Sequence, residues 1–560
     1  MNKKRVAITI SLLISSNLVI GATYDLENKQ QNDLTDPGLM SFEKNELHNS
    51  FQGAKSFDQQ QVIADKKQAY LDTLNLFKQN KFEDAQIKIN DLINKYPKEA
   101  EFYNLQGLLE TVRKNDDLAI KSYQRSIELN QNNLKAHLGL AMLFVRTGKL
   151  QKATVHADKA LSIKENSIAA YFLLAEIAYK ENRQEDVESL LLTAQKKVQG
   201  NVDQEIAVAK NLVKLYAAKK QLEKSLVLAQ QIIKRYPENS LALAFLANAQ
   251  IVNNDREEAI QTLEKLIQLE KKDIPHRLVL AKLLLNQAKN EKQILRLLDE
   301  ITAISPDNPQ VLAQKTVFLI KLNQLPEALN VVDKIRLLVP DTALSDFLEG
   351  EIYLADKKLD QALSVFQKAY KIKPNTKTLN VIINILIAQY NQPEAIRFLE
   401  KVLKNSPDNL VAHFKLASIY EMQKNTRGAA KHYQAVLAEQ PDNALVLNNL
   451  AWLYYQENNP KALALAEKAY KQAPKSAPVA DTYGVILVKQ GDLAQGIEIL
   501  EQASKQAPSA YDIQYHLADA YSIKGDNKQA IEILTSIVKS KQDFTEKNAA
   551  IRLLKKLEES

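Results

Sequence analysis

The sequence predicts an all-α protein in which paired helices stack along one axis as a solenoid. Two observations support this prediction. Prolines recur at intervals of 33 or 34 residues, at Pro306, Pro340, Pro374, Pro407, Pro441, Pro474 and Pro508. Within each interval, apolar residues recur twice at the spacing of an amphipathic helix. A fixed period of this length indicates a repeat architecture in which each unit packs against its neighbours.

The period places fourteen repeat units within residues 66–544. They begin at residues 66, 100, 134, 168, 206, 240, 274, 309, 343, 377, 410, 444, 477 and 511. The unit that begins at 168 contains additional residues around Gln199 to Gln204, and the unit that begins at 274 contains one. We therefore expect the array to be distorted near 195–205 and 285–305.

Two positions in each unit are almost always small, counting from the first residue of the unit. Gly107 and Gly350 are examples at position 8, and Ala119 and Ala362 are examples at position 20. Small residues there allow the two helices of a unit to approach closely. The turn between the helices often contains Gly or Asn, for which a positive φ is inexpensive, as at Gly148, Asn182, Gly491 and Gly525.

This pattern resembles the tetratricopeptide repeat, and the resemblance extends over residues 66–544. It implies antiparallel helix pairs stacked into a right-handed superhelix of about fourteen units. It further implies a concave groove that binds proteins, lined by positions 2, 5, 9, 12 and 13 of the first helices.

Three short segments near the C-terminus resemble a narrower group. They are Asn448 to Trp452, Asp481 to Gly484 and Tyr515 to Ala518. They are similar to the C-terminal end of bacterial tetratricopeptide repeat proteins linked to exopolysaccharide production and PEP-CTERM surface-protein sorting. The resemblance implies a role in the bacterial envelope, although the chain has no cysteine for lipid anchoring.

The two ends of the chain differ from the array. Residues 1–22 combine Lys3, Lys4 and Arg5 with a short apolar run, which predicts a signal peptide cleaved near Ala22 and a periplasmic or secreted protein. An uncleaved membrane anchor is the alternative. Residues 23–65 are rich in Gln, Asn and Asp and are predicted to be a low-complexity leader. Residues 545–560 predict an amphipathic capping helix, which covers the exposed end of a solenoid.

No motif in the sequence predicts catalysis, a cofactor or a metal ion. The seven histidines include no pair at a spacing of three or four residues, and there is no Gly-rich phosphate loop. His137 and His413 share unit position 4, where we expect them to pack in the core. The 74 basic and 67 acidic residues are intermixed, which does not favour a nucleic-acid partner.

Two sets of residues are candidates for binding in the groove. Lys210, Lys214, Asn248 and Lys282 occupy positions 5 or 9 of three successive units and could bind a carboxylate or an acidic segment. Trp452 and Tyr455 occupy positions 9 and 12 beside Asn448 and Asn449, and Phe172, Phe347, Phe414 and Tyr515 occupy position 5. Their rings could stack on sugars or hold an apolar peptide. Ordinary solvated surface and packing are the alternatives for both sets.

The function predicted from these features is that of an exported, non-catalytic scaffold. We expect it to hold protein partners in the bacterial envelope, in exopolysaccharide secretion or surface assembly. A protein that binds polysaccharide directly and an accessory subunit of an envelope enzyme complex are the alternatives.

Overall fold

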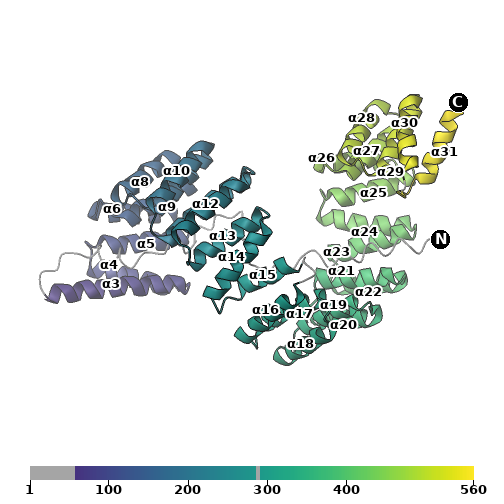
Figure 1. Cartoon of the computed structure of the whole chain (residues 1–560). Helices are drawn as coiled ribbons and strands as arrows, with labels where there is room; N and C mark the ends of the chain where they lie inside the picture. The colour runs from purple at the N-terminus through teal and green to yellow at the C-terminus, as the bar shows by residue number, and fades with distance from the viewer. Residues whose placement is uncertain (1–56, 286–289, 541, 560) are drawn as a thin grey trace. The chain divides into compact units, whose positions relative to one another are not determined.

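The computed structural model of the 560-residue chain describes residues 57–285, 290–540 and 542–559. These residues form 29 α-helices and no strand, which confirms the predicted all-α class (Figure 1). The helices form fourteen consecutive pairs, and one further helix follows the last pair. The described chain divides into two compact units, residues 57–311 and residues 312–559, and each is described here by itself.

The unit of residues 57–311 contains seven helix pairs. Its helices are α3 (Phe57–Lys78), α4 (Phe82–Lys95), α5 (Ala100–Val112), α6 (Asp116–Leu129), α7 (Leu134–Arg146), α8 (Leu150–Ile163), α9 (Ile168–Lys180), α10 (Gln184–Lys197), α11 (Val202–Ala218), α12 (Leu222–Arg235), α13 (Ser240–Val252), α14 (Arg256–Leu269), α15 (Pro275–Leu284) and α16 (Glu291–Ile304). The expected signal peptide, and the expected leader as far as residue 56, lie outside the described residues.

The unit of residues 312–559 contains the other seven pairs, beginning within α17, which crosses the boundary between the units. Its helices are α17 (Pro309–Lys321), α18 (Leu325–Leu338), α19 (Leu344–Ala355), α20 (Leu359–Ile372), α21 (Thr376–Ala388), α22 (Gln392–Asn405), α23 (Leu410–Met422), α24 (Thr426–Glu439), α25 (Ala444–Gln456), α26 (Lys461–Gln472), α27 (Ala477–Gln490), α28 (Leu493–Gln506), α29 (Tyr511–Lys524), α30 (Asn527–Lys539) and α31 (Lys547–Glu558).

The first helices of the pairs begin at or next to the expected unit starts, with two exceptions. Helix α3 begins at Phe57, before the expected start at residue 66. Helix α11 begins at Val202 and has 17 residues, whereas α9 and α13 have 13 each. The additional residues near 199–204 therefore lengthen the N-terminal end of a first helix and do not form a separate loop.

Asparagine side chains fix the start of several first helices. In α23, the Oδ1 atom of Asn409 accepts a hydrogen bond from the backbone N–H of Ala412 at 3.0 Å. Asn443 does the same for Val446 at the start of α25, at 3.2 Å. Such a side chain satisfies one of the donors that a helix leaves unpaired at its N-terminus.

The turn within a pair contains one residue in the left-handed region of φ. Glycine or asparagine occupies it at many of the described turns, which confirms the sequence prediction. These residues are Asn80, Gly148, Asn182, Asn254, Asn323, Asn458, Gly491 and Gly525. Residues with longer side chains adopt the same conformation at Lys114, Lys220, Lys357, Tyr390 and Lys424.

The predicted small positions lie where the helices of a pair are in contact. Ala119 and Ala362 are both 0% exposed. A Cβ atom added to Gly350 would lie 2.7 Å from the ring of Phe366, and one added to Gly107 would lie 2.7 Å from the ring of Tyr123. A larger side chain at these positions must displace its neighbours on the partner helix. The same positions are therefore small in one unit after another.

The packing order places the first helices side by side. Consecutive helices contact each other from α3 to α16 and from α18 to α31, and first helices of successive pairs also contact each other, as α11 and α13, α25 and α27, and α27 and α29 do. Side chains from successive first helices can therefore form one surface. Among the described residues, no helix is long and apolar enough to span a membrane.

Helix α31 covers the last pair, as the capping helix predicted over residues 545–560 was expected to do. It contacts both α29 and α30. Leu553, Leu554 and Leu557, which the sequence places on one face, pack against a cluster that includes Leu534 and Ile537. The end of the array is therefore closed by apolar burial.

Candidate functional site

The lysine set lies on three first helices in the unit of residues 57–311. Lys210 and Lys214 are one turn apart on α11, and Asn248 lies on α13, which packs directly against α11. Lys282 lies on α15, in the following pair. Lys214 and Lys282 are exposed, while Lys210 and Asn248 are partly buried. The structure thus brings three of the four side chains onto adjoining helices.

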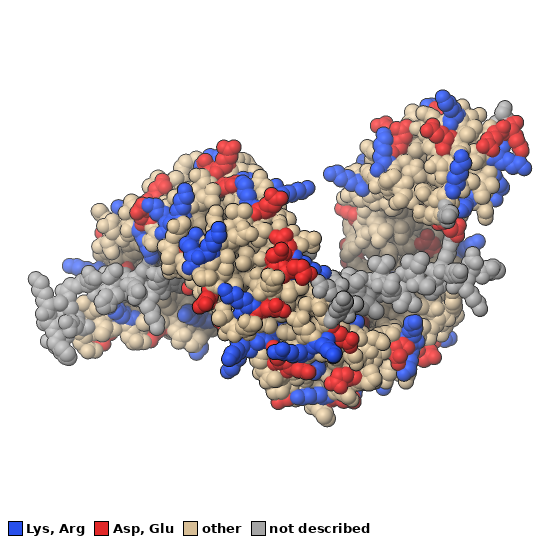
Figure 2. Space-filling model, viewed as in Figure 1, with Lys and Arg blue, Asp and Glu red and all other residues tan. Residues whose placement is uncertain are grey.

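Surface charge outside this set is mixed. On the face shown in Figure 2, Lys and Arg side chains alternate with Asp and Glu over both units. Many of them form ion pairs between neighbouring pairs of helices, as Lys219 does with Glu188 at 2.8 Å. The arrangement is that of a solvated surface, as the composition predicts.

The aromatic set lies on α25, in the unit of residues 312–559. The ring centroids of Trp452 and Tyr455 are 5.2 Å apart, and both side chains are partly exposed. Asn448 lies one turn earlier, and its Oδ1 atom is buried with no hydrogen-bond partner among the described residues. The predicted residues Asn448, Trp452 and Tyr455 therefore follow each other along one helix.

Side chains from α27 and α29 extend this surface beyond what the sequence predicted. The ring centroid of Trp452 is 5.9 Å from that of His516, which is 5.8 Å from that of Tyr515. Asp481 on α27 accepts a hydrogen bond from His516 on α29. We refer to this surface as the aromatic–acidic cluster. It consists of Trp452, Tyr455, Asp481, Tyr515, His516 and Asp519.

His516 and Asp481 form a buried ion pair in this cluster. The Nδ1 atom of His516 lies 2.9 Å from each carboxylate oxygen of Asp481, and the side chains are only 16% and 13% exposed. Burial opposes a charge on His516, but the hydrogen bond and the negative charge of Asp481 outweigh it and raise the pKa of His516. The pair therefore favours a positive imidazole and a negative carboxylate.

Asp519 is the second carboxylate of the cluster. Burial raises its pKa, and the charges of His516 and Lys556 only partly oppose that effect. Burial, and then the negative charge of Asp519, raise the pKa of both Tyr455 and Tyr515. The carboxylate of Asp519 thus lies close enough to both phenols to act on them electrostatically.

Two histidine pairs lie elsewhere, one in each unit. The Nδ1 atoms of His137 and His156 are 2.9 Å apart, and those of His413 and His432 are 2.8 Å apart. The Nε2 atom of His413 lies 3.0 Å from the carbonyl oxygen of Pro407, which can only accept. Nε2 of His413 therefore carries a hydrogen, and in the neutral tautomer its Nδ1 atom accepts from His432.

The environment favours a neutral ring at His137, His156 and His432. Burial lowers the pKa of His137 and of His156. Burial, with the charges of His413 and Lys431, lowers the pKa of His432 to about 4. In each pair an aromatic ring packs against the second histidine, Phe144 against His156 and Tyr420 against His432. The expectation of core packing at position 4 is thus confirmed for His137, which is buried, whereas His413 is only partly buried.

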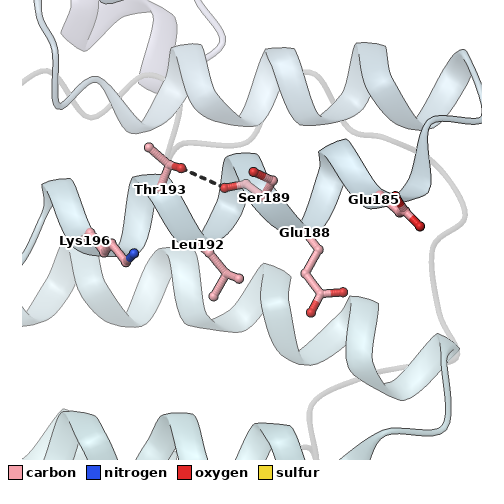
Figure 3. Close-up of a pocket in the computed structure, with 6 residues that line it drawn as sticks. All are labelled: Glu185, Glu188, Ser189, Leu192, Thr193 and Lys196. Carbon is pink, nitrogen blue, oxygen red and sulfur yellow. Dashed lines mark hydrogen bonds between the residues drawn. The ribbon is translucent and has the colours of Figure 1, made fainter.

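One surface cavity, of about 410 Å³, lies along α10 (Figure 3). All of its lining residues belong to that helix: Glu185, Glu188, Ser189, Leu192, Thr193 and Lys196. The hydroxyl of Thr193 donates to the backbone carbonyl of Ser189 at 2.8 Å, and Glu188 is paired with Lys219 and Lys224. Among the described residues, no group of three or more acidic or histidine side chains could hold a metal ion.

Family models of the tetratricopeptide repeat match most of the array. One matches residues 74–133, 319–375, 384–444 and 423–480, and a second matches residues 216–283 and 487–557. Together they cover more than half of the 560 residues. The chain belongs to the tetratricopeptide repeat family. No enzymatic family is indicated.

Two curated proteins are similar to parts of this chain. A BBSome complex member BBS4 homolog of Drosophila melanogaster is 20% identical over 332 residues, which are 57% of this chain and 67% of that protein. The anaphase-promoting complex subunit CDC16 of Saccharomyces cerevisiae is 39% identical over 59 residues, which are 10% of this chain and 7% of that protein.

Two solved structures also align with the repeat array. The crystal structure of the APC/C hetero-tetramer Cut9–Hcn1 has a TM-score of 0.34 at 16% identity, and covers 82% of this chain and 96% of that one. The structure of Naa15/Naa10 bound to HypK-THB has a TM-score of 0.29 at 13% identity, with 90% and 93% covered.

The repeat sequence contained signals for the residues that the prediction missed. Asp481 and Asp519 occupy positions 5 and 9 of their units, which line the groove in the family, so their positions alone could have drawn attention to them. The two histidine pairs share a separation of 19 residues. This repeated spacing links position 4 of a first helix to the second helix of the same unit.

Proposed function

We propose that this tetratricopeptide repeat protein is an exported, non-catalytic scaffold that holds protein partners in the bacterial envelope. The observation that carries the proposal is the convergence of half-buried aromatic and charged side chains from α25, α27 and α29 on one surface. Surfaces with an aromatic centre and polar surroundings are typical of protein–protein interfaces. The names of both curated relatives describe members of multiprotein complexes, which supports an assembly role.

The proposed location rests on the N-terminal sequence. Lys3, Lys4 and Arg5 precede a short apolar run and then small residues, as in a secretory signal peptide. The proposed link to exopolysaccharide secretion or surface assembly rests on the resemblance of the C-terminal segments that contain Trp452 and His516. These segments also supply the aromatic–acidic cluster.

Fractionation and partner capture test the two parts of this proposal separately. In a bacterial host, the mature N-terminus is expected near Ala22 or Thr23, in the soluble periplasmic fraction. Recovery of intact Met1 in the membrane fraction would contradict export. The tagged mature protein is then incubated with envelope extract, and the captured proteins are identified. Untagged scaffold in excess should displace specifically bound proteins from the tagged protein. If it displaces none of the captured proteins, the scaffold function is contradicted.

The lysine set supports a second contact with an acidic segment of a partner. Exposed cations at Lys214 and Lys282 attract carboxylates, and salt screens that attraction. The double variant Lys210→Ala/Lys282→Ala is expected to weaken capture at low salt, with less effect at high salt. The matched control, Lys234→Ala/Lys292→Ala, removes the same charge from exposed positions on the second helices α12 and α16.

Direct binding of polysaccharide is the second candidate function. The adjacent, partly exposed rings of Trp452 and Tyr455 favour it because flat aromatic faces stack on sugar rings. Titration with envelope polysaccharide distinguishes the candidates. Saturable binding that Trp452→Ala abolishes, in the absence of any captured protein, would favour the polysaccharide function.

A further inference from the structure

The two carboxylates of the aromatic–acidic cluster have different partners. Asp481 directs both oxygens to Nδ1 of His516, so its charge is compensated within the chain. Asp519, one turn beyond Tyr515 on α29, makes no hydrogen bond and no ion pair with any described residue. Partial burial of a carboxylate is unfavourable, and here only the charges of His516 and Lys556 offset it.

The same arrangement occurs twice more in the array, and there the chain supplies a cation. Position 5 is aromatic and position 9 is acidic in the units that begin at 168 and 343, as they are in the unit of Tyr515 and Asp519. In the unit that begins at 168, the acidic residue is Glu176, which pairs with Lys180 at 3.7 Å.

In the unit that begins at 343, the cation comes from the next first helix. The Nζ atom of Lys377 on α21 lies 4.3 Å from the ring centroid of Phe347 on α19. Its positive charge also acts on Glu351, the acidic residue at position 9. The lysine thus lies over the aromatic ring, and its charge partly opposes the rise in the pKa of Glu351 that burial causes.

Among the described residues, no lysine lies over the ring of Tyr515 or forms an ion pair with Asp519. Where Lys180 stands in the earlier unit, four residues after the carboxylate, this unit has Ile523. His516, and Lys556 of α31, act on Asp519 only through their charges. The rings of Trp452 and Tyr455 add two more faces that attract a cation, since the face of an aromatic ring is electronegative.

We infer that the aromatic–acidic cluster binds a lysine or arginine side chain from an extended segment of a partner protein. The charged group lies at the Asp519 carboxylate, and the aliphatic stem packs on the neighbouring rings. This inference rests on the proposed scaffold function and specifies the chemistry of the partner. It follows from charge complementarity, because in the two related units a lysine of the chain lies at the carboxylate in one and over the aromatic ring in the other.

Trp452 makes the site directly measurable, because it is the single tryptophan in the sequence. The full-length mature protein is titrated with blocked pentapeptides that carry arginine, lysine or neutral citrulline at the centre. The fluorescence of Trp452 is the readout. Arginine and lysine peptides are expected to give saturable changes, with affinity at least about tenfold above the citrulline peptide because both the carboxylate and the rings select for charge.

The variant Asp519→Asn tests the carboxylate. Its affinity for the arginine peptide is expected to fall about tenfold or more, the loss typical of one charge-assisted contact. Its thermal unfolding is expected to be unchanged or shifted upward, because a carboxylate without a partner is replaced by a neutral group. Glu498→Gln is the matched control, since it removes one exposed charge from the adjoining helix α28 and leaves the cluster intact.

Several outcomes would overturn the inference. Equal affinity for the citrulline and arginine peptides would exclude recognition of a cation. Equal affinity of Asp519→Asn and wild type would exclude the carboxylate. A saturable fluorescence change with oligosaccharide but with none of the peptides would show that the rings bind sugar and not a basic side chain. Partner capture that Asp519→Asn does not affect would overturn the inference while leaving the scaffold function intact.

Discussion

At the scale of single residues, the turn within each helix pair imposes the strictest requirement. Its left-handed residue has a positive φ, a region that side chains with a Cβ atom enter at a cost. Glycine and asparagine fit this requirement well. Tyr390 does not, because it adopts a φ of 57° although its side chain is 73% exposed and gains little from packing. The fold therefore tolerates local strain at this turn.

Replacing Tyr390 by glycine should relieve that strain. We expect Tyr390→Gly to raise the free energy of unfolding by about 0.5–1 kcal/mol, the conformational cost removed less the entropy cost of glycine. Urea unfolding measures the change. Gln389→Gly is the matched control and should lower stability, because Gln389 has a φ of −81°. A decrease for Tyr390→Gly would mean that its side chain stabilises the turn.

The pKa of His432 predicts how stability depends on pH. Its folded value, about 4, lies below the ordinary value of 6.5, so the unfolded chain binds the proton more tightly. Stability from this residue is complete above pH 6.5 and decreases as pH falls from 6.5 toward 4. Unfolding in urea at pH 7 and pH 5 should show the decrease, and His432→Gln should reduce it. An identical pH dependence in the variant would contradict the neutral, buried state of the ring.

At the scale of helices, close approach within a pair depends on a few small side chains. Ala362 on α20 is 0% exposed and belongs to a cluster with Phe366 and Ile382. Interiors are packed too densely to accept three additional carbon atoms without displacement. The repeat therefore depends on small side chains at fixed positions as much as on apolar residues.

Ala362→Leu should overpack this pair. We expect it to lower the free energy of unfolding by about 1–3 kcal/mol, since a well-packed core must move to accept it. Ser364→Leu is the matched control because Ser364 lies two residues away on the same helix but is exposed. Thermal unfolding compares the two variants. Equal effects would show that the assigned phase of the repeat is incorrect at α20.

The sequence predicted the helices of this fold more completely than the interactions of the residues at its candidate site. Repeat phase, small positions and the capping helix all follow from periodicity, which is a property of the chain alone. Trp452 and Tyr455 could be predicted in the same way, because the positions that line the groove recur in each unit. Asp519 also occupies a groove position, but its significance depends on its burial and on Ile523, which stands where the earlier unit has Lys180. The pairing of His413 with His432 also required the geometry of a complete unit.

At the scale of the whole molecule, contacts are almost entirely between neighbouring helices. In the part of the chain that the structure describes, separate apolar clusters follow each other along the sequence, as those around Leu140, Leu212 and Leu399 do. Stability in such an array is approximately a sum of terms for units and their interfaces. A defect is therefore expected to remain near its origin.

Tyr123→Ala tests this locality. Tyr123 is buried between Gly107 and Gly139, so its loss leaves a cavity among α5, α6 and α7. We expect hydrogen exchange to accelerate in these helices and to remain unchanged in residues 312–559. Mass spectrometry of exchanged peptides measures both regions. Accelerated exchange throughout the chain would contradict a nearest-neighbour array.

One contact at the start of the array reaches further than the next pair. The Nζ atom of Lys135 on α7 lies 3.4 Å from Glu101 on α5 and 4.7 Å from the ring centroid of Tyr70 on α3. Its side chain and that of Glu101 are almost fully buried. Gene rearrangements that add or delete one repeat among these pairs would leave a buried charge without its partner. We therefore expect the number of repeats to change more easily outside the first three helix pairs during evolution. The first three pairs should be retained together.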